Sequence, residues 1–370
     1  MIYHVLTEQE NFSEFEGGAI SRWVANVLRD EPDTHIICQK ADNSWGFERD
    51  RVHLLPGLHN YIRFRARRLY PAWLSGAILR NLGLPGIAEL KPGDVLWVHG
   101  EPAIASALIH LKQSSRAKMV IHLHGAAFLT HNRGMLARLA ATCDRLVFCS
   151  QFLESDAHRR FPELRRTTVL YNGADGRLFR PLGFAKANDP PLIVQASRMH
   201  PQKGVHVLLS AMRLLEERGI RAQARIYGAA FFGGSRVTPY LREVQRDAPA
   251  NVHLAGYAYG EELASAIRSA DVYCLPSTFE DPFPLAIPEA MASGLAVVAS
   301  RAGGIPEAME TFGGLLVPKS DPIALADALQ QLILAPEQRT AMGLRAREAY
   351  EKFFTWKAVR QGYREILETL

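Results

Sequence analysis

The chain has 370 residues, of which 48% are hydrophobic and 22% charged, with a formal net charge of +5. This length predicts two domains that each bury a core, and the composition is that of an average folded protein. No apolar run reaches the roughly 18 residues that a membrane-spanning helix needs. Residues 1–10 read as a strand instead of a signal peptide, and the four cysteines lack a CxxC pair, so we expect buried free thiols in the cytoplasm.

The basic surplus belongs to the first half of the chain. Residues 1–180 contain 23 Lys and Arg against 18 Asp and Glu, whereas residues 181–370 contain 20 of each. Arginines interleave with aromatic residues at 59–83, as in a helix that lies on an anionic membrane surface, possible here as a peripheral contact. A solvated helix face is the commoner explanation of such a pattern. No nucleic-acid-binding motif accompanies it, so nucleic acid is not an expected partner.

Strand-like runs alternate with helical stretches along the whole chain. Those of the first half are IYHVL, THIICQ, RVHLL, DVLWVHG, KMVIHLHG, RLVFCS and TVLYNG; those of the second are LIVQAS, ARIYG, NVHLAG, DVYCLPS, LAVVAS and GLLVP. This alternation predicts α/β domains with parallel sheets covered by helices on both faces. Pro, Gly and polar residues at 180–191 break the pattern, which predicts a first domain at 1–180 and a second at 181–353. The final residues, 351–370, read as one helix.

Three features of the first domain are candidates for function. Gly17 and Gly18 lie between the first strand and a helix, where glycine lets a phosphate or a sugar approach the backbone. The pattern is not GxGxxG, which argues against a nicotinamide dinucleotide. His124 ends a buried strand at the edge where parallel sheets bind ligands, although a lone histidine is more often a core residue. Asn172 precedes a glycine and favours a turn.

The second domain carries two cations after its first strand. Arg198 and Lys203 lie in the turn between LIVQAS and a helix that opens at Gly204. The planar guanidinium and the mobile ammonium could together hold a diphosphate and neutralise charge as it leaves. Most Arg and Lys side chains in proteins are simply exposed at the surface. The position of these two cations at the end of a strand nevertheless favours a functional role for them.

Two carboxylates eight positions apart, Asp281 and Glu289, flank the start of a further helix. Backbone N–H groups near Pro284 and Leu285 would meet a phosphate, and Glu289 would accept hydrogen bonds from two hydroxyls of a ribose. Alternatively, Asp281 caps the helix and Glu289 is solvated. Glu280, beside Asp281, leaves open which carboxylate meets a sugar. Because DxD and metal-ligand spacings are absent, we expect no metal and no cofactor.

Together these segments resemble the retaining glycosyltransferases of family 4, which have the GT-B fold. The resemblance covers nearly the whole chain, and its motifs are the glycine pair at 17–18, HG at 124–125, VLYNGADGRLF at 169–179, the turn with Arg198 and Lys203, VHLAGYAYGEEL at 252–263 and the acidic pair. The pair matches the E-x7-E motif, with Asp281 at its first position. Residues 226–240 are similar to a subgroup that includes spore-coat-type transferases.

The resemblance implies two Rossmann-like domains that face each other across a cleft, with a C-terminal helix at 354–370 returning to the acceptor-binding first domain. The second domain would bind a nucleoside diphosphate sugar, with UDP as the expected nucleotide. The acceptor would be a glycan, a lipid-linked molecule or a small molecule. Catalytic roles fall to His124, Asp281, Arg198 and Lys203, and donor-binding roles to Gly17, Gly18, Ala258, Phe283, Pro284, Leu285 and Glu289.

Two other functions are compatible with the same fold. A sugar-nucleotide epimerase would need acid and base groups around the sugar and no acceptor, and the acidic pair favours transfer over it. A catalytically silent carbohydrate-binding protein would not need Arg198, Lys203 and Glu289, which are all present.

Overall fold

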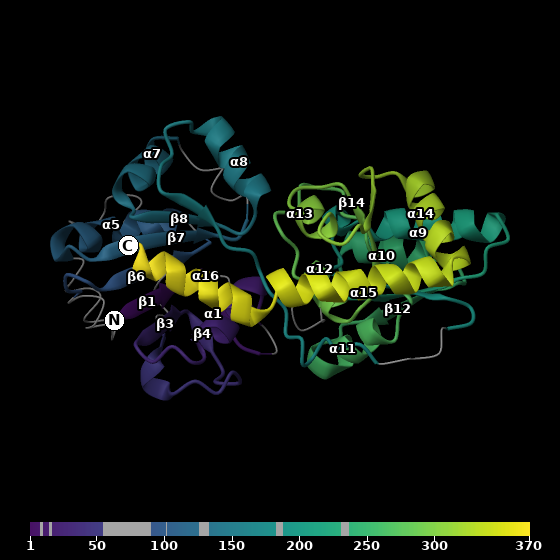
Figure 1. The fold of residues 1–370 in the computed structure, drawn as a ribbon, viewed down its shortest axis with the longest axis horizontal. Helices are drawn as coiled ribbons and strands as arrows, with labels where there is room; N and C mark the ends of the chain where they lie inside the picture. Colours follow the sequence, from purple (N-terminus) through teal and green to yellow (C-terminus); the bar gives the residue numbers. More distant parts are fainter. Residues whose placement is uncertain are drawn as a thin grey trace. The chain divides into compact units, whose positions relative to one another are not determined.

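The computed structural model describes residues 1–7, 10–14, 17–54, 90–100, 102–125, 133–182, 188–230 and 237–370. They form two compact units (Figure 1): Met1–Tyr171 with Arg360–Leu370, and Asn172–Val359. The basic aromatic stretch 59–83 lies outside the described residues. Among the helices that are described, none combines the length and the apolar run that a membrane crossing requires.

The first unit is built on a parallel seven-stranded sheet in the order β5-β3-β1-β6-β7-β8-β9. Its strands are β1 (Ile2–Val5), β3 (Thr34–Cys38), β5 (Val52–Leu54), β6 (Val95–His99), β7 (Lys118–Leu123), β8 (Arg145–Phe148) and β9 (Thr167–Val169). Two short strands, β2 (Asn11–Phe12) and β4 (Lys40–Ala41), pair separately. The chain order reverses between β1 and β6, so the carboxyl ends of these two strands mark the edge at which such sheets bind ligands.

The helices of the first unit are α1 (Ala19–Leu28), α5 (Pro102–Ser115), α7 (Arg133–Thr142) and α8 (Gln151–Arg160), with a 3-10 turn η1 (Arg49–Arg51). α1 is amphipathic, because Trp23, Val24 and Val27 recur on one face and are fully buried. Ser150 caps α8 by accepting a hydrogen bond from the Leu153 N–H at 3.2 Å.

The second unit repeats this plan on six parallel strands in the order β12-β11-β10-β13-β14-β15. The strands are β10 (Leu192–Ala196), β11 (Gln223–Tyr227), β12 (Val252–Gly256), β13 (Val272–Leu275), β14 (Ala296–Ser300) and β15 (Leu315–Val317). All thirteen strand-like runs therefore form strands, and the predicted class of two doubly wound α/β domains is confirmed. The order reverses between β10 and β13, which places the loops after these two strands side by side.

The helices of the second unit cover both faces of its sheet. They are η3 (Pro201–Lys203), α9 (Val205–Glu217), α10 (Pro239–Asp247), α11 (Gly260–Arg268), α12 (Ala286–Ala292), α13 (Ile305–Met309), α14 (Pro322–Leu334) and α15 (Pro336–Phe353). α9 packs against α14, and α12 packs against α15 (Figure 1). Asp321 caps α14 through hydrogen bonds from the Ile323 and Ala324 N–H groups.

The prediction of one helix over 351–370 is wrong. α15 ends at Phe353, and α16 (Trp356–Glu368) starts after a break. At the break the Phe354 carbonyl accepts a hydrogen bond from the Ala174 N–H at 3.0 Å, and Thr355 pairs with Ala174 in a parallel bridge. Backbone groups used in this pairing cannot continue the helical ladder. The buried Phe354 side chain holds the break in place.

The boundary between the two units differs from the one that the sequence pattern predicted. The division lies between Tyr171 and Asn172 instead of after 180, because the Ala174 backbone bonds to Phe354 and to the Tyr350 hydroxyl within the second unit. From Arg360 onward α16 belongs to the first unit. There Arg360 pairs with Asp30 at 2.5 Å.

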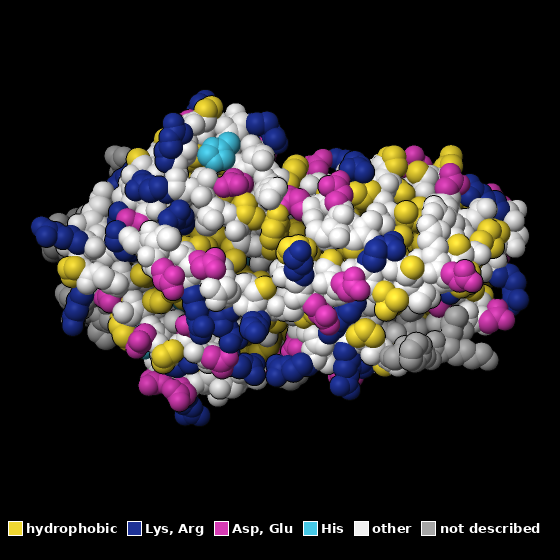
Figure 2. Space-filling model, viewed as in Figure 1, with side chains coloured by type: hydrophobic (Ala, Val, Ile, Leu, Met, Phe, Trp, Pro, Cys, Tyr) yellow, Lys and Arg dark blue, Asp and Glu magenta, His cyan; other side chains and the backbone are white. Residues whose placement is uncertain are grey.

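Charges of both signs are distributed over the surface. On the face shown in Figure 2, Lys and Arg side chains are interspersed with Asp and Glu. Arg364 with Glu31 and Arg347 with Glu351 are pairs of this kind, at 2.8 Å and 2.7 Å. The four cysteines are buried and free, as expected.

Candidate functional site

Two loops of the second unit are locked together where the order of its strands reverses. Gly204, between η3 and α9, has a φ of 69°, and a Cβ atom there would lie 1.8 Å from the Pro276 carbonyl oxygen that follows β13. The Thr278 N–H donates a hydrogen bond of 2.8 Å to the Gln202 carbonyl. Only glycine permits both this conformation and this approach, so the turn after β10 is held against the loop after β13.

This packing brings Lys203 and Asp281 together. The Lys203 Nζ lies 2.5 Å from Asp281 Oδ2, and only 14% and 6% of the two side chains are exposed. The ammonium also lies 5.1 Å above the centre of the Phe279 ring, and the Ser277 hydroxyl is 3.4 Å from the same carboxylate oxygen. A shielded ion pair with these neighbours holds both charged groups in one place.

Glu280 points to different partners from Asp281. It binds Lys319 and accepts a hydrogen bond of 2.6 Å from the Gly303 N–H. The Lys319 ammonium, together with that N–H, lowers the pKa of Glu280 despite its partial burial. The next loop also fixes the Asp281 backbone, because the Gly304 N–H donates to the Asp281 carbonyl at 2.8 Å. Of the two neighbouring carboxylates, Asp281 is the one that faces Lys203.

Glu289 lies in α12 and is 6% exposed, so the alternative of a solvated helix residue is wrong. Burial, followed by the charge of Glu289, raises the pKa of the Tyr273 hydroxyl on β13. The capping alternative for Asp281 is wrong too, because the residue at the N-cap of α12 is Leu285 and no side chain caps this helix. Glu289 and Asp281 are thus both buried carboxylates, and the charge of each raises the pKa of Tyr273 on β13.

The loop before α12 is anchored by a residue that the sequence suggested only as a turn former. The buried Asn172 donates a hydrogen bond of 3.1 Å from Nδ2 to the Phe283 carbonyl. Phe283 is itself buried, and Pro284 and Leu285 follow it, half-buried, at the start of the helix. An amide that holds a loop from 111 positions away leaves no local signal in the sequence.

Arg198 and Ala258 occupy other parts of the same sheet edge. The exposed Arg198 side chain lines a cavity of about 580 Å³ with residues of the α10 start, including Thr238 and Tyr240. Within the described parts of the chain, no ion pair joins its guanidinium to a carboxylate, whereas Asp281 pairs with Lys203. Ala258 is buried in the turn between β12 and α11.

In the first unit, Gly17 and Gly18 pack against the loop that precedes them. A Cβ atom on Gly17 would lie 2.2 Å from the Ser13 carbonyl, and one on Gly18 would lie 2.3 Å from the Glu10 carboxylate. The Gly18 N–H donates to Glu10 Oε2 at 2.9 Å. Burial raises the pKa of Glu10 although backbone N–H groups of the α1 start oppose this. The N-terminus of α1 therefore holds a carboxylate of the protein itself.

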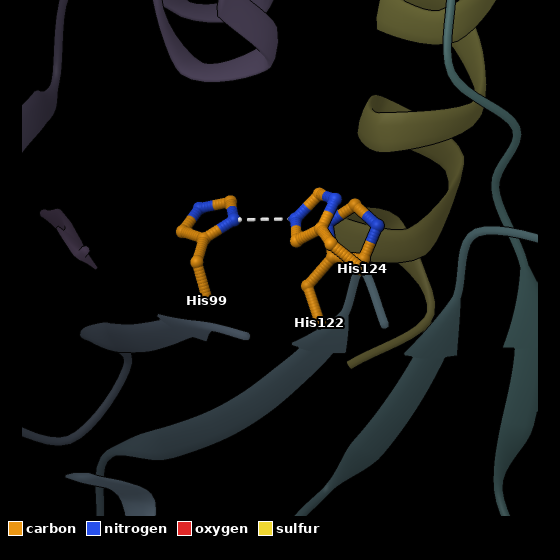
Figure 3. Close-up of side chains that lie close together, drawn as sticks. All are labelled: His99, His122 and His124. Atoms are coloured by element: carbon orange, nitrogen blue, oxygen red, sulfur yellow. Dashed lines mark hydrogen bonds between the residues drawn. The ribbon is translucent and has the colours of Figure 1, made fainter. Parts of the chain in front are cut away.

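His124 follows β7 and joins a cluster of histidines (Figure 3). Its Nε2 lies 3.0 Å from Nδ1 of His99, which ends the neighbouring strand β6. Burial lowers the pKa of His124 to about 3 and keeps the ring neutral. His99 was not among the predicted site residues, although the runs DVLWVHG and KMVIHLHG both end in His-Gly and form adjacent strands.

The cluster also includes His122, on the same strand face as His124. His99, His122 and His124 offer nitrogen atoms that all lie within 4.8 Å of one another, close enough to hold a metal ion. Spacing along the chain could not reveal this set, because it combines residues of two strands. The expectation that the reaction needs no metal stays a prediction.

Comparisons with known proteins identify the family. Residues 24–177 match Glycosyltransferase Family 4, and residues 183–349 match Glycosyl transferases group 1. The chain therefore belongs to the family 4 glycosyltransferases, as its motifs predicted, and it is a glycosyltransferase.

Relatives with assigned names support this membership. The putative colanic acid biosynthesis glycosyltransferase WcaL of Escherichia coli is 26% identical over 97% of this chain and 88% of its own. A GDP-mannose-dependent monoacylated alpha-(1-6)-phosphatidylinositol monomannoside mannosyltransferase of Corynebacterium glutamicum is also 26% identical, over 75% and 76% of the two chains. Spore coat protein SA of Bacillus subtilis, 23% identical over 76% and 80%, agrees with the predicted similarity to spore-coat-type transferases.

Solved structures confirm the GT-B fold. Anabaena Alr3699/HepE, determined in complex with UDP-glucose, matches with a TM-score of 0.76 at 19% identity over the whole of both chains. At this identity the likeness shows the fold alone.

Proposed function

We propose that the protein is a retaining glycosyltransferase that moves one sugar from a UDP-sugar to a glycan, lipid-linked or small-molecule acceptor. The observation that carries this proposal is the shielded pair of Lys203 and Asp281 at the reversal point of the second sheet, followed in the chain by the buried Glu289 on α12. Ligands of doubly wound sheets bind at that edge. The UDP-glucose bound to HepE supports UDP as the nucleotide.

The side chains of this edge suit the parts of a nucleotide sugar. Glu289 would accept hydrogen bonds from the ribose hydroxyls, and the backbone around Ala258 would contact the base. Backbone N–H groups of Phe283 and Leu285, next to Pro284, would meet the diphosphate at the start of α12. Gly17 and Gly18 would contact the donor from the first unit, as the resemblance to family 4 implies.

The charges of the site suggest which residues take part in the reaction. Arg198 and Lys203 would neutralise the diphosphate as it leaves, and Asp281 would meet the sugar while it orients Lys203. His124 would contact the donor sugar near the reacting carbon. We propose that the leaving group departs from the same face that the acceptor attacks, so that a phosphate oxygen takes the acceptor proton and no protein base is needed.

A donor screen tests the proposal. Hydrolysis and transfer are measured with UDP-, GDP- and ADP-linked sugars, and UDP-sugars are expected to be used best. The Corynebacterium relative is named for GDP-mannose, so a preference for GDP-sugars would change the proposed nucleotide and leave the transferase intact. An α-linked donor should give an α-linked product, and a β-anomeric signal in the proton NMR spectrum would exclude the retaining mechanism.

We further propose that no metal ion takes part, because Arg198 and Lys203 can supply the charge that a divalent cation supplies elsewhere. Initial rates should stay nearly unchanged when EDTA is added. Complete loss of turnover, restored only by manganese or magnesium, would contradict this. The buried free cysteines suit the reducing cytosol, where we place the enzyme.

A further inference from the structure

Three histidine rings of the first unit gather at the carboxyl ends of two neighbouring strands (Figure 3). His99 ends β6 opposite His122 on β7, and His124 follows β7. Each residue offers a ring nitrogen, and the three nitrogens all lie within 4.8 Å of one another. Imidazole nitrogen is a preferred zinc ligand, and three histidines with an open fourth position are a known zinc donor set. The cluster thus has the chemistry of a zinc site.

The separation of two of these nitrogens suits a shared metal ion. His99 Nδ1 and His124 Nε2 are 3.0 Å apart, the hydrogen bond drawn in Figure 3. Two nitrogens that bind one tetrahedral zinc ion, at about 2.0 to 2.1 Å from it, are about 3.3 Å apart. Zinc can therefore replace the proton that the two nitrogens share. Each ring then carries its proton on the nitrogen that faces away from the ion.

The polar atoms of the third ring, His122, are left unused by the fold. His122 is fully buried, and among the described residues neither of its ring nitrogens has a hydrogen-bond partner. A buried polar group without a partner is costly and rare in folded proteins. The ring lies 3.9 Å from that of His124, centre to centre. Because no hydrogen bond holds it, the ring can turn toward the other two nitrogens, and a metal ion would satisfy it.

The ring of His99 is held from its other side. Its Nε2 lies 3.0 Å from Nδ1 of His4 on β1, and His4 Nε2 lies 3.0 Å from the Tyr363 hydroxyl of α16. His4 and Tyr363 are fully buried. Histidines that bind metals almost always make such a hydrogen bond with the nitrogen that does not bind the ion, and this bond fixes the orientation of the ring. The Nδ1 atom of His99 is thereby directed toward His124.

We propose that His99, His122 and His124 bind one zinc ion, with a water molecule as the fourth ligand. His124 is half-buried whereas the other two are fully buried, so the ion reaches the cluster from the side of His124. The ion is not needed for transfer. It holds the ring that contacts the donor sugar in the proposed function, and zinc therefore inhibits the enzyme. The inhibition rests on the proposed function, whereas the binding of zinc does not.

The test uses the full chain, without a histidine tag and freed of metal. Titration calorimetry with zinc chloride measures affinity and stoichiometry, and cobalt in place of zinc gives the visible absorption of a tetrahedral ion. We expect one zinc ion per chain, with a Kd of about 10 μM or tighter. At ten times this Kd, zinc should lower turnover about 11-fold, because only about one molecule in 11 remains free of the ion. Excess EDTA should restore the rate.

His122→Phe removes one ligand and keeps an aromatic ring beside Trp23, whose centre lies 4.9 Å from that of His122. It should weaken zinc binding at least about 10- to 100-fold and abolish the cobalt spectrum. The control is His53→Phe, because His53 Nε2 lies 2.9 Å from His35 Nδ1 in a pair that has no third ligand within the described part of the chain. This variant should bind zinc like the wild type. The rate of each variant in zinc is compared with its own zinc-free rate.

Several results would overturn the proposal. One is a wild type that binds no zinc below about 100 μM, which can be measured even if His122→Phe does not fold. Others are an equal zinc affinity in His122→Phe and the wild type, or a loss of affinity in His53→Phe alone. Zinc that binds at the three histidines without lowering turnover would instead refute the contact of His124 with the sugar. A wild type that accepts no sugar nucleotide would refute the proposed function and leave the calorimetry and the cobalt spectrum unchanged.

Discussion

Lys203 and Asp281 are far less exposed than most surface ion pairs, which contribute little to stability. Their burial means that each charge depends on the other, because an unpaired charge at that depth is strongly unfavourable. The same loop offers a natural comparison in Lys319 with Glu280, a pair that is 36% and 50% exposed. The two lysines should therefore respond very differently to substitution.

We predict that Lys203→Ala lowers kcat more than it raises the donor KM, because Lys203 meets a charge that grows as the glycosidic bond breaks. Loss of one preorganised electrostatic donor typically lowers kcat about 100- to 1000-fold. Lys203→Arg should restore only part of the activity, since a planar fork does not replace a compact ammonium. Steady-state kinetics measures both constants.

Lys319→Ala is the matched control and should keep kcat within about threefold, in line with the small effect of exposed pairs. Melting curves of both variants are needed as well, since Lys203→Ala also leaves Asp281 buried without a partner and should cost about 3 to 5 kcal/mol of stability. A rise in KM alone, with kcat retained, would show that Lys203 only docks the donor.

Glu289→Ala should weaken binding of UDP severely. Hydrogen bonds to a charged group contribute roughly 1.5 to 3 kcal/mol each, so the loss of two corresponds to at least about a hundredfold change in Kd. Isothermal titration calorimetry measures it, and Glu310→Ala, which removes an exposed carboxylate paired with Arg301, is the control. A change of less than about threefold for Glu289→Ala would rule out the ribose assignment.

At the scale of elements, the turn from β10 to α9 depends on Gly204. Two glycines at opposite ends of α9 have nearly the same backbone conformation, with φ of 69° at Gly204 and 72° at Gly219. They differ in their surroundings, because a Cβ on Gly204 would meet the Pro276 carbonyl at 1.8 Å whereas one on Gly219 would meet nothing within 4 Å.

Gly219→Ala should therefore destabilise the protein by about 1 to 2 kcal/mol, the cost of a left-handed alanine. Gly204→Ala should cost clearly more, on the order of 3 kcal/mol or above, because the loop after β13 has to move. It should also reduce activity by separating Lys203 from Asp281. Urea unfolding compares the two variants, and equal losses would contradict the close approach of the loops.

The elements were largely predictable because strands buried on both faces leave continuous apolar runs in the sequence. The helix break at Phe354 was not, since it arises from hydrogen bonds with Ala174, a residue 180 positions away. The hydrogen bond from the Gly18 N–H to Glu10 at the start of α1 was not predictable either, because no motif or periodic pattern links the two residues.

At the scale of the whole molecule, the buried histidines should make stability depend on pH. His4, His99 and His124 have pKa values lowered by burial, to about 3 for His4 and His124. In the unfolded chain these rings titrate near 6.5, so below that pH unfolding takes up protons. Stability is thus fully present above about pH 6.5 and is lost as the pH falls toward 3.

We predict that the free energy of unfolding falls by about 1 kcal/mol per pH unit for each of these histidines between roughly pH 6 and pH 4. Glu10, whose pKa burial raises, opposes part of this change. Urea titrations followed by tryptophan fluorescence measure the slope. His4→Phe should make the slope shallower by about one proton. A slope that is flat in both the wild type and His4→Phe would contradict the neutral state of these buried histidines.

The sequence by itself determined the alternation of strands and helices, the strands of the two large sheets and the family motifs, because these are local or periodic properties of the chain. It also indicated which charged residues follow strands at the ligand-binding edge. Only the tertiary structure decided that Asp281 instead of Glu280 faces Lys203, that Asn172 anchors the loop at Phe283 and that Tyr363 reaches His4. Those contacts join residues far apart in the chain. The spacing of residues along the sequence does not show which side chains on adjacent strands face each other.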